Sequence, residues 1–247
     1  MEAEVNLGSV LVIEDEHDIR LMMVRLLKQA GFQVFSAETG EDGIMLAREH
    51  QPTVITLDRM LPGMDGLTVC KSLREDPETS DLYVLMITAM GDTEDRIDGL
   101  ESGADDYLSK PFQNKEMLLR VKAGAKRVTK FRKQNASTSQ DDLNNSKQKY
   151  GRLEVDDVQH RVWIDGGEVN MTITEYKLLG HMIGKNNALC SRGELLEHVW
   201  ELPPTLNTRT VDTHVKRLRQ KMGPLSNYIE TVRGAGYRFC VPSEDRA

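Results

Sequence analysis

The sequence predicts an α/β domain with a parallel sheet, followed by a smaller domain of different architecture, and three observations support this. In the front half, short apolar runs alternate with helical patterns, which is typical of strands joined by crossover helices. Residues 1–124 hold 12 Lys and Arg against 24 Asp and Glu, whereas residues 125–247 hold 20 against 15. A polar stretch rich in Asn, Ser and Gln covers residues 133–149. We therefore predict a first domain at 1–124, a helix end and flexible linker at 125–148, and a second domain at 149–247.

Composition excludes several classes of protein. Cys70, Cys190 and Cys240 are far apart and lack CxxC spacing, so neither a disulfide framework nor a zinc knuckle is expected. The N-terminal segment is acidic where a signal peptide would be basic, and no apolar run has the length of a membrane span. We expect a soluble cytoplasmic protein without membrane contact.

Five strands are expected in the first domain. They are "VLVI" (10–13), "QVFSA" (33–37), "VITL" (54–57), "VLMI" (84–87) and "DYLSK" (106–110). Strands that alternate with helices form a parallel sheet, and such sheets bind ligands at the carboxyl ends of the strands. The five-stranded flavodoxin-like order 2-1-3-4-5 makes the first and third strands neighbours.

Polar residues gather at those carboxyl ends. Glu14 and Asp15 follow the first strand, Asp58 the third, Thr88 the fourth and Lys110 the fifth. Each alone is most simply a turn former, a helix charge or a solvated strand end. Together they place three carboxylates in one crevice, where a cation must offset their repulsion, and an all-oxygen site suits Mg²⁺. With a hydroxyl and a lysine added, the set indicates phosphoryl transfer onto Asp58.

The motifs "VLVIEDE", "LDRMLPGMDG" and "ITAMGDTEDRIDGLESGADDYLSKPF" resemble the receiver domain of two-component response regulators, from residue 9 to about 124. The metal ligands implied by this resemblance are Glu14, Asp15, Asp58 and the backbone carbonyl of Met60. It also implies that Asp58 accepts a phosphoryl group from a sensor histidine kinase, that Lys110 contacts this group, and that Thr88 and Tyr107 form a switch. Arg59 departs from the apolar residue often found there, and we expect it to alter the kinase-facing surface or the local metal affinity.

The same resemblance implies a symmetric dimer of the phosphorylated receiver. The residues expected at its interface are Arg96, Glu101, Asp106, Glu116, Arg120 and Arg127. The expected salt bridges join Arg96 to Glu116 and Asp106 to Arg120 across a two-fold axis. The alternative is that these charges form solvated helix faces.

The second domain has different patterns. Residues 150–170 read as short antiparallel strands, with turn signals at "DD" and "DGG". Three helices follow: the first is capped by Thr172 or Thr174, the second begins at Ser191 with Glu194 at capping-box spacing, and the third ends at Gly223. A hairpin, "IETVRGAGYRFCV", comes last.

The third helix has an apolar stripe and a basic face. The stripe is Val211, Val215, Leu218 and Met222. Opposite lie Arg209, Thr213, Lys216 and Gln220, with Arg217 to the side and His214 and Arg219 flanking. This arrangement favours a recognition helix in the major groove of double-stranded DNA over a merely solvated basic helix, because Arg233 or Arg238 of the hairpin could reach a minor groove.

The segments "RTVDTHVKRLRQKM" and "TVRGAGYRF" resemble the winged-helix effector domain of OmpR/PhoB-type response regulators, over about 149–242. The resemblance implies that the loop at 201–207 can contact RNA polymerase. The residues expected to contact DNA are Arg209, Thr213, His214, Lys216, Arg217, Arg219, Arg233 and Tyr237.

Three functions fit these features. The leading hypothesis is a phosphorylation-gated, sequence-specific transcription factor that binds repeated DNA half-sites as a dimer and catalyses only its own phosphoryl transfer and slow dephosphorylation. A free-standing Mg²⁺ phosphatase is disfavoured, because no second acid in a DxD pattern follows Asp58 and the basic domain would be unexplained. A receiver that only docks, beside constitutive DNA binding, is disfavoured by the complete set of Asp58, Thr88, Tyr107 and Lys110.

Overall fold

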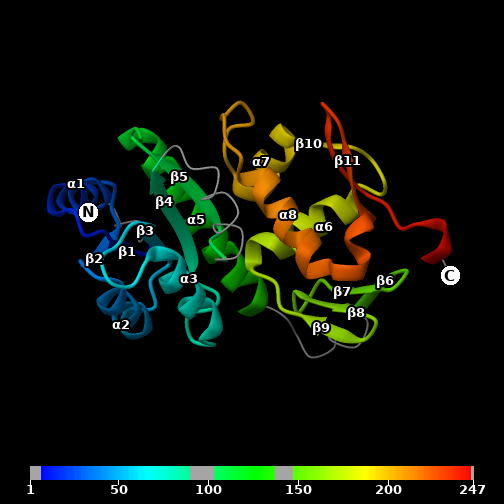
Figure 1. Ribbon diagram of the computed structural model, residues 1–247, viewed down its shortest axis with the longest axis horizontal. Helices are drawn as coiled ribbons and strands as arrows, with labels where there is room; N and C mark the ends of the chain where they lie inside the picture. The colour runs from blue at the N-terminus through cyan, green and yellow to red at the C-terminus, as the bar shows by residue number, and fades with distance from the viewer. Residues whose placement is uncertain (1–6, 90–102, 137–146, 246–247) are drawn as a thin grey trace. The chain divides into compact units, whose positions relative to one another are not determined.

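A computed structural model describes residues 7–89, 103–136 and 147–245. The chain divides into two compact units, 1–130 and 131–247 (Figure 1). Each unit has its own sheets and helices. Among the described residues, no helix is both long enough and apolar enough to cross a membrane.

The first unit contains a five-stranded parallel sheet in the order β2-β1-β3-β4-β5, which confirms the predicted topology. Its strands are β1 (Ser9–Ile13), β2 (Gln33–Ala37), β3 (Val54–Asp58), β4 (Tyr83–Ala89) and β5 (Asp106–Lys110). Every residue of β3 is buried, because this strand lies in the middle of the sheet with helices over both faces.

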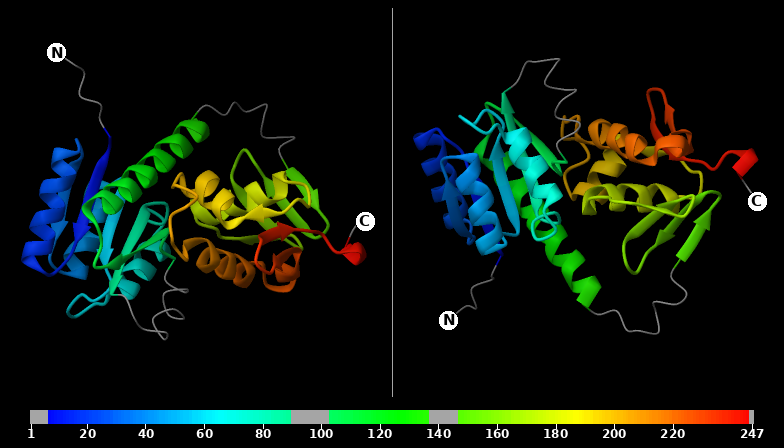
Figure 2. Two further views of the ribbon diagram at one scale, coloured as in Figure 1. Left: turned by 90° about the horizontal axis from the view of Figure 1, so that it is seen from above. Right: turned by 60° about the horizontal axis from the view of Figure 1, so that its bottom comes forward.

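Four described helices cover the sheet on its two faces (Figure 2). They are α1 (His17–Gln29), α2 (Gly40–His50), α3 (Gly66–Glu75) and α5 (Asn114–Ala136). Alternate residues of β1 point to opposite faces. Val10 and Val12 share a core with α1 and α5, whereas Leu11 and Ile13 share one with α2 and α3. Helix α5 extends into the predicted linker region, whose residues 137–146 lie outside the described part of the chain.

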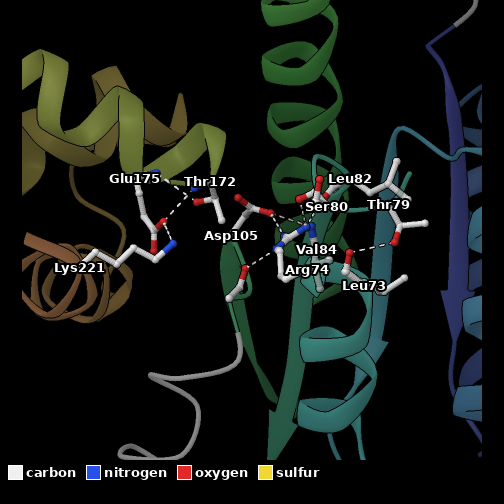
Figure 3. Close-up of polar contacts among 11 residues, drawn as sticks. Leu73, Arg74, Thr79, Ser80, Leu82, Val84, Asp105, Thr172, Glu175 and Lys221 are labelled. Atoms are coloured by element: carbon white, nitrogen blue, oxygen red, sulfur yellow. Dashed lines mark hydrogen bonds and ion pairs between the residues drawn. The ribbon is translucent and has the colours of Figure 1, made fainter. Parts of the chain in front are cut away.

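Arg74 of α3 fastens the helix to the amino ends of β4 and β5 (Figure 3). Its Nη2 lies 2.6 Å from the Asp105 carboxylate, and its Nη1 donates to the carbonyls of Ser80 and Leu82 at 2.7 Å. Asp105 also accepts from the backbone N–H of Val84 (2.9 Å). These bonds hold the strand ends opposite to those that carry the predicted site.

The second unit begins with a four-stranded antiparallel sheet in the order β6-β7-β8-β9, as predicted for residues 150–170. Its strands are β6 (Lys147–Tyr150), β7 (Leu153–Asp156), β8 (Arg161–Ile164) and β9 (Gly167–Val169). Three helices follow: α6 (Ile173–Gly184), α7 (Arg192–Trp200) and α8 (Thr210–Met222). The predicted stripe of α8 is buried, at 0–2% exposure for Val211, Val215, Leu218 and Met222.

The predicted hairpin forms and gains a third strand. It comprises β11 (Ile229–Val232) and β12 (Gly236–Phe239), and the short strand β10 (Cys190–Ser191) pairs with β12. Two 3-10 helices complete the described part of the unit, η2 (Gly223–Tyr228) and η3 (Ser243–Asp245). Strand β10 was not predicted, because a strand of two residues has no periodicity in the sequence.

Helix α6 begins with a complete capping box at Thr172, which settles the choice between the two threonines. The Thr172 hydroxyl accepts from the Glu175 N–H (3.3 Å), and the Glu175 carboxylate accepts from the Thr172 N–H (2.9 Å). Lys221 of α8 donates to the same carboxylate at 2.6 Å (Figure 3). The cap therefore also joins α6 to α8.

Candidate functional site

The predicted acidic site assembles at the carboxyl edge of the parallel sheet. Glu14, Asp15 and Asp58 offer oxygen atoms that all lie within 4.8 Å of one another. Lys110 Nζ lies 2.7 Å from Asp58 Oδ2 and 3.1 Å from Glu14 Oε1. Because β1 and β3 are neighbours, residues 44 apart in the chain share this edge. The arrangement that the sequence predicted for these four side chains is present.

The site holds more buried negative charge than its lysine offsets. Glu14 and Asp58 are 1% and 3% exposed. Glu14 Oε2 lies 3.1 Å from Lys110 Nζ but accepts no hydrogen bond from the described residues. Burial, followed by the charge of Asp58, raises the pKa of Glu14 to about 7. Burial disfavours the charge on Lys110, yet both carboxylates outweigh it and raise the pKa of the lysine.

These features fit a divalent cation. Three carboxylates form an all-oxygen set, and one buried oxygen among them accepts no hydrogen bond from the described part of the chain. This set matches the preference of Mg²⁺ for hard oxygen ligands and retained waters. Met60 is 69% exposed, and its backbone N–H donates to Asp58 Oδ1 (3.2 Å). Asp58 is therefore oriented from both sides, by Met60 through Oδ1 and by Lys110 through Oδ2.

Two residues that support the site were not predicted. Arg20 of α1 donates to the carbonyls of Glu14 (2.7 Å) and Asp15 (2.9 Å) and pairs with Glu38. Gly66 lies so close to β3 that an added Cβ would sit 2.1 Å from the Asp58 carbonyl oxygen. The turn motif "LPGMDG" contains this glycine, but only the packing shows why a side chain is excluded there.

The predicted switch residues lie on the two strands beside the acidic site. Thr88 is half-buried near the end of β4, and its hydroxyl donates to the carbonyl of Ala89 (3.4 Å). It pairs in register with Ser109, the residue before Lys110. Tyr107 is half-buried on β5 and pairs in register with Met86. Thr88 and Tyr107 thus lie on the adjacent strands β4 and β5, and β5 is an edge strand of the sheet.

The predicted dimer residues are only partly described. Arg96 and Glu101 lie outside the described residues. Asp106 and Arg120 are joined within one chain, by bonds of 2.7 and 2.9 Å from Nη1, and Arg120 also donates to Glu116 at 2.8 and 3.0 Å. Arg127 lies over the ring of Tyr83, 5.1 Å from its centroid. The expected Asp106–Arg120 pair therefore forms in the single chain, where the resemblance implied a bond between chains.

The exposed face of α8 is basic and polar. Arg209, Lys216 and Gln220 are exposed or half-exposed, and so is Thr213. In the hairpin turn Arg233 is exposed, whereas Arg238 pairs with Glu230 on the adjacent strand (2.5 Å). Four of the predicted DNA contacts, Arg209, Thr213, Lys216 and Arg233, are therefore accessible.

Two other predicted DNA contacts are buried. His214 is 0% exposed, its ring lies edge-on to Trp200 at a centroid distance of 5.0 Å, and its Nδ1 lies 3.0 Å from the carbonyl of Thr210. It packs inward because it follows Thr210 and Val211 by about one helical turn and lies on their side of α8. Arg217 is 3% exposed. The expectation that His214 flanks the DNA-facing side is corrected by this packing.

The last two predicted contacts stabilise the hairpin. Arg219 donates through Nε and Nη2 to the carbonyl of Ile229 (3.0 and 2.6 Å) and through Nη2 to the Thr231 hydroxyl (2.8 Å). Tyr237 is 5% exposed, and its hydroxyl donates to Asp212 of α8. Two of the three guanidinium nitrogens of Arg219 are thus used within the domain, where the sequence suggested a phosphate contact.

Comparisons with known proteins identify both units. Residues 10–122 match the family model of the response regulator receiver domain, and residues 166–239 match that of the C-terminal domain of transcriptional regulatory proteins. The transcriptional regulatory protein SrrA of Staphylococcus aureus is 40% identical over 242 residues, which cover 96% of this chain and 98% of SrrA.

Among solved structures, a mutant of RitR shares the fold. It is 22% identical, the match covers 95% of this chain and 100% of the RitR chain, and the TM-score is 0.70. The Thermotoga maritima response regulator DrrB, described as an OmpR/PhoB homologue, is 31% identical over 94% of this chain and 98% of its own, with a TM-score of 0.46.

A receiver with an acidic pocket, followed by a winged-helix domain that has an exposed basic helix face, defines a response regulator with a DNA-binding output domain. The chain belongs to the OmpR/PhoB-type family of two-component response regulators. It is a transcription regulator of this class.

Proposed function

We propose that this protein is a phosphorylation-gated, sequence-specific transcription factor whose phosphoryl acceptor is Asp58. The carrying observation is the pocket in which Asp58 and Glu14 share one lysine while the buried Glu14 Oε2 accepts no hydrogen bond from the described residues. Glu14, Asp15, Asp58 and the Met60 carbonyl would hold Mg²⁺. When bound, Mg²⁺ supplies charge neutralisation for phosphoryl transfer.

The side chains present account for the transfer. A carboxylate oxygen of Asp58 attacks phosphorus, and a P–O bond forms while the P–N bond to the histidine of a sensor kinase breaks. The proton balance is simple, because Asp58 reacts as a carboxylate and the leaving imidazole takes its proton from water. Lys110, already 2.7 Å from Asp58, is placed to pair with a phosphoryl oxygen.

The phosphoryl group then biases the neighbouring strands. It adds nearly two negative charges beside β4 and β5, which attract the Thr88 hydroxyl and let Tyr107 turn inward. A change at Tyr107 reaches the adjacent Asp106, which bonds Arg120 within the chain. Exchange of this bond for its symmetric counterpart in a second chain would give a two-fold dimer.

The output domain binds DNA through its exposed cations. Thr213, Lys216 and Gln220 of α8 enter the major groove together with Arg209, the residue before the helix, while Arg233 reaches the minor groove from the hairpin. A dimer presents two such helices and therefore selects repeated half-sites. Pro203, Pro204 and Thr205 are exposed in the loop at 201–207, where RNA polymerase could dock.

DNA selection from a random-sequence pool tests the proposal. Full-length protein is used with Mg²⁺, with and without a small-molecule phosphodonor, beside Asp58→Asn. We expect donor-dependent enrichment of paired half-sites, absent from the variant. Equal enrichment in every condition would favour constitutive DNA binding, and multiple-turnover phosphate release from a monoester would favour the phosphatase alternative.

A further inference from the structure

A second cluster of ligand-type side chains lies in the output domain, apart from the acidic pocket. It contains His181 of α6, Cys190 of β10 and Glu194 of α7, whose ligand atoms all lie within 4.8 Å of one another. The Cys190 side chain is fully buried, and those of His181 and Glu194 are 18% and 23% exposed. Three separate elements therefore direct a thiol, an imidazole and a carboxylate to one half-buried point.

Glu194 has left the position that its place in the helix favours. Ser191 caps α7 by accepting from the Glu194 N–H (3.1 Å), which completes half of a capping box. The Glu194 carboxylate does not return to Ser191 as Glu175 does to Thr172. Its Oε1 instead lies 3.3 Å from His181 Nε2 and 2.5 Å from Lys185 Nζ. The carboxylate thus faces the cluster and holds a cation there.

His198 lies beside the cluster with one ring nitrogen already fixed. Its ring centroid is 4.9 Å from that of His181, and its Nδ1 is 2.9 Å from the carbonyl of Glu194. A carbonyl only accepts, so Nδ1 carries the proton and Nε2 of the neutral ring keeps a lone pair. Metal-binding imidazoles are commonly held in this way by a backbone carbonyl.

We propose that His181, Cys190 and Glu194, joined by His198, bind a transition-metal ion such as Zn²⁺. A thiolate, imidazoles and a carboxylate form a donor set that Zn²⁺ accepts in tetrahedral geometry. The ion takes the place of the Lys185 ammonium on Glu194, and the Cys190 thiol releases its proton to solvent on binding. The proton that His181 Nε2 donates to Glu194 moves to Nδ1 through exchange with solvent, so that Nε2 offers the ion a lone pair. This site is independent of Asp58 and of phosphorylation.

The site adjoins the elements that bind DNA. Cys190 pairs in register with Tyr237 of β12, and Tyr237 bonds Asp212 of α8. A bound ion would fix β10 against α6 and α7. Because β10 pairs with β12, the ion would also restrain this strand of the hairpin. Metal occupancy therefore acts on the part of the hairpin next to its turn, where β10 pairs with Gly236 and Tyr237.

Titration of the full-length, reduced protein with Co²⁺ tests the site, because Co²⁺ bound to a thiolate gives a charge-transfer band that the all-oxygen acidic pocket cannot give. We expect one equivalent to saturate this band and Zn²⁺ to abolish it. Cys190→Ser should remove the band, whereas Cys240→Ser, which changes another thiol of the same unit, should retain it. Absence of the band from the wild-type protein, or its dependence on Cys240, would overturn the proposal.

Two further variants keep the test decisive if Cys190→Ser fails to fold. His181→Gln should weaken Co²⁺ binding by at least about tenfold, as expected for loss of a ligand. Lys185→Ala should tighten it by roughly tenfold, because it removes a competing ammonium. If His181→Gln leaves affinity unchanged, or Lys185→Ala weakens binding, the cluster is only an ion-pair network and the metal site is refuted.

Discussion

Glu14 and Glu175 are both 1% exposed and both contact a lysine, yet their surroundings differ in a way that separates function from stability. The Glu175 carboxylate pairs with Lys221, and it also accepts a hydrogen bond from the Thr172 N–H. Burial disfavours its charge, but Lys221 outweighs burial and lowers its pKa. Glu14 shares Lys110 with Asp58, and one of its oxygens accepts no bond from the residues that the structure describes.

A buried carboxylate with a full complement of donors stabilises the fold, whereas one that lacks them is held at a cost that a ligand or a reaction can relieve. The raised pKa of Glu14 and the lowered pKa of Glu175 are the electrostatic signs of these two situations. We therefore expect opposite changes in the free energy of unfolding when a charge is removed at each of these two sites.

The largest expected effect is on phosphoryl uptake. Asp58→Asn should abolish incorporation from a small-molecule phosphodonor, because the amide oxygen is a poor nucleophile. Intact-protein mass spectrometry measures the added group. Asp65→Asn is the matched control, since Asp65 caps α3 and an Asn preserves that cap. An Asp58→Asn protein that still gains one phosphoryl mass would show that another residue is the acceptor.

Glu175→Gln should destabilise the output domain by roughly 1–3 kcal/mol, because a buried charged hydrogen bond to Lys221 is lost. Trp163 and Trp200 are the two tryptophans of the chain and both lie in the second unit, so tryptophan fluorescence follows its unfolding in urea. Glu154→Gln is the control. The ion pair between Glu154 and Lys149 is half-exposed and 3.9 Å long, so its loss should cost about 0.5 kcal/mol or less. If both variants lose the same free energy of unfolding, the buried Glu175–Lys221 pair does not stabilise the domain more than an exposed pair does.

Removal of a negative charge from the acidic pocket should stabilise the fold, in contrast to Glu175→Gln. Without Mg²⁺ at pH 8, Asp58→Asn should stabilise the receiver by about 1 kcal/mol, because it relieves repulsion with Glu14. Hydrogen exchange of the β3 amides reports receiver stability. Saturating Mg²⁺ should reverse the order, since it stabilises the wild type that binds it. A destabilised variant in metal-free buffer would mean that the Lys110 pair dominates the pocket.

The last expected effect is a pair of opposed dependences of stability on pH. The folded pKa of Glu14 is raised from 4.5 to about 7, so its contribution to stability is present below 4.5 and lost as pH rises through about 7. The folded pKa of Glu175 is lowered, so its contribution is present above 4.5 and lost as pH falls below that value. Hydrogen exchange for the receiver and tryptophan fluorescence for the output domain should separate the two, and the Glu14 trend should disappear in saturating Mg²⁺.

The sequence by itself determined the sheet order and the acidic pocket. Short apolar runs that alternate with helices fix a parallel sheet, and a parallel sheet brings the residues after its strands to one edge. Glu14, Asp58 and Lys110 were therefore predictable although up to 96 residues separate them. The stripe of α8 was predictable for a similar reason, because helical periodicity alone sets which residues share a face.

Only the tertiary structure decided which partner each long side chain takes. Arg219 could have faced a phosphate but bonds the hairpin, and His214 packs on Trp200 inside the domain. Asp106 finds Arg120 within its own chain, and Glu194 turns from its cap toward His181. Periodicity gives the direction in which a side chain leaves its element, but the choice among donors on other elements depends on packing distances of a few ångströms, which no one-dimensional pattern contains.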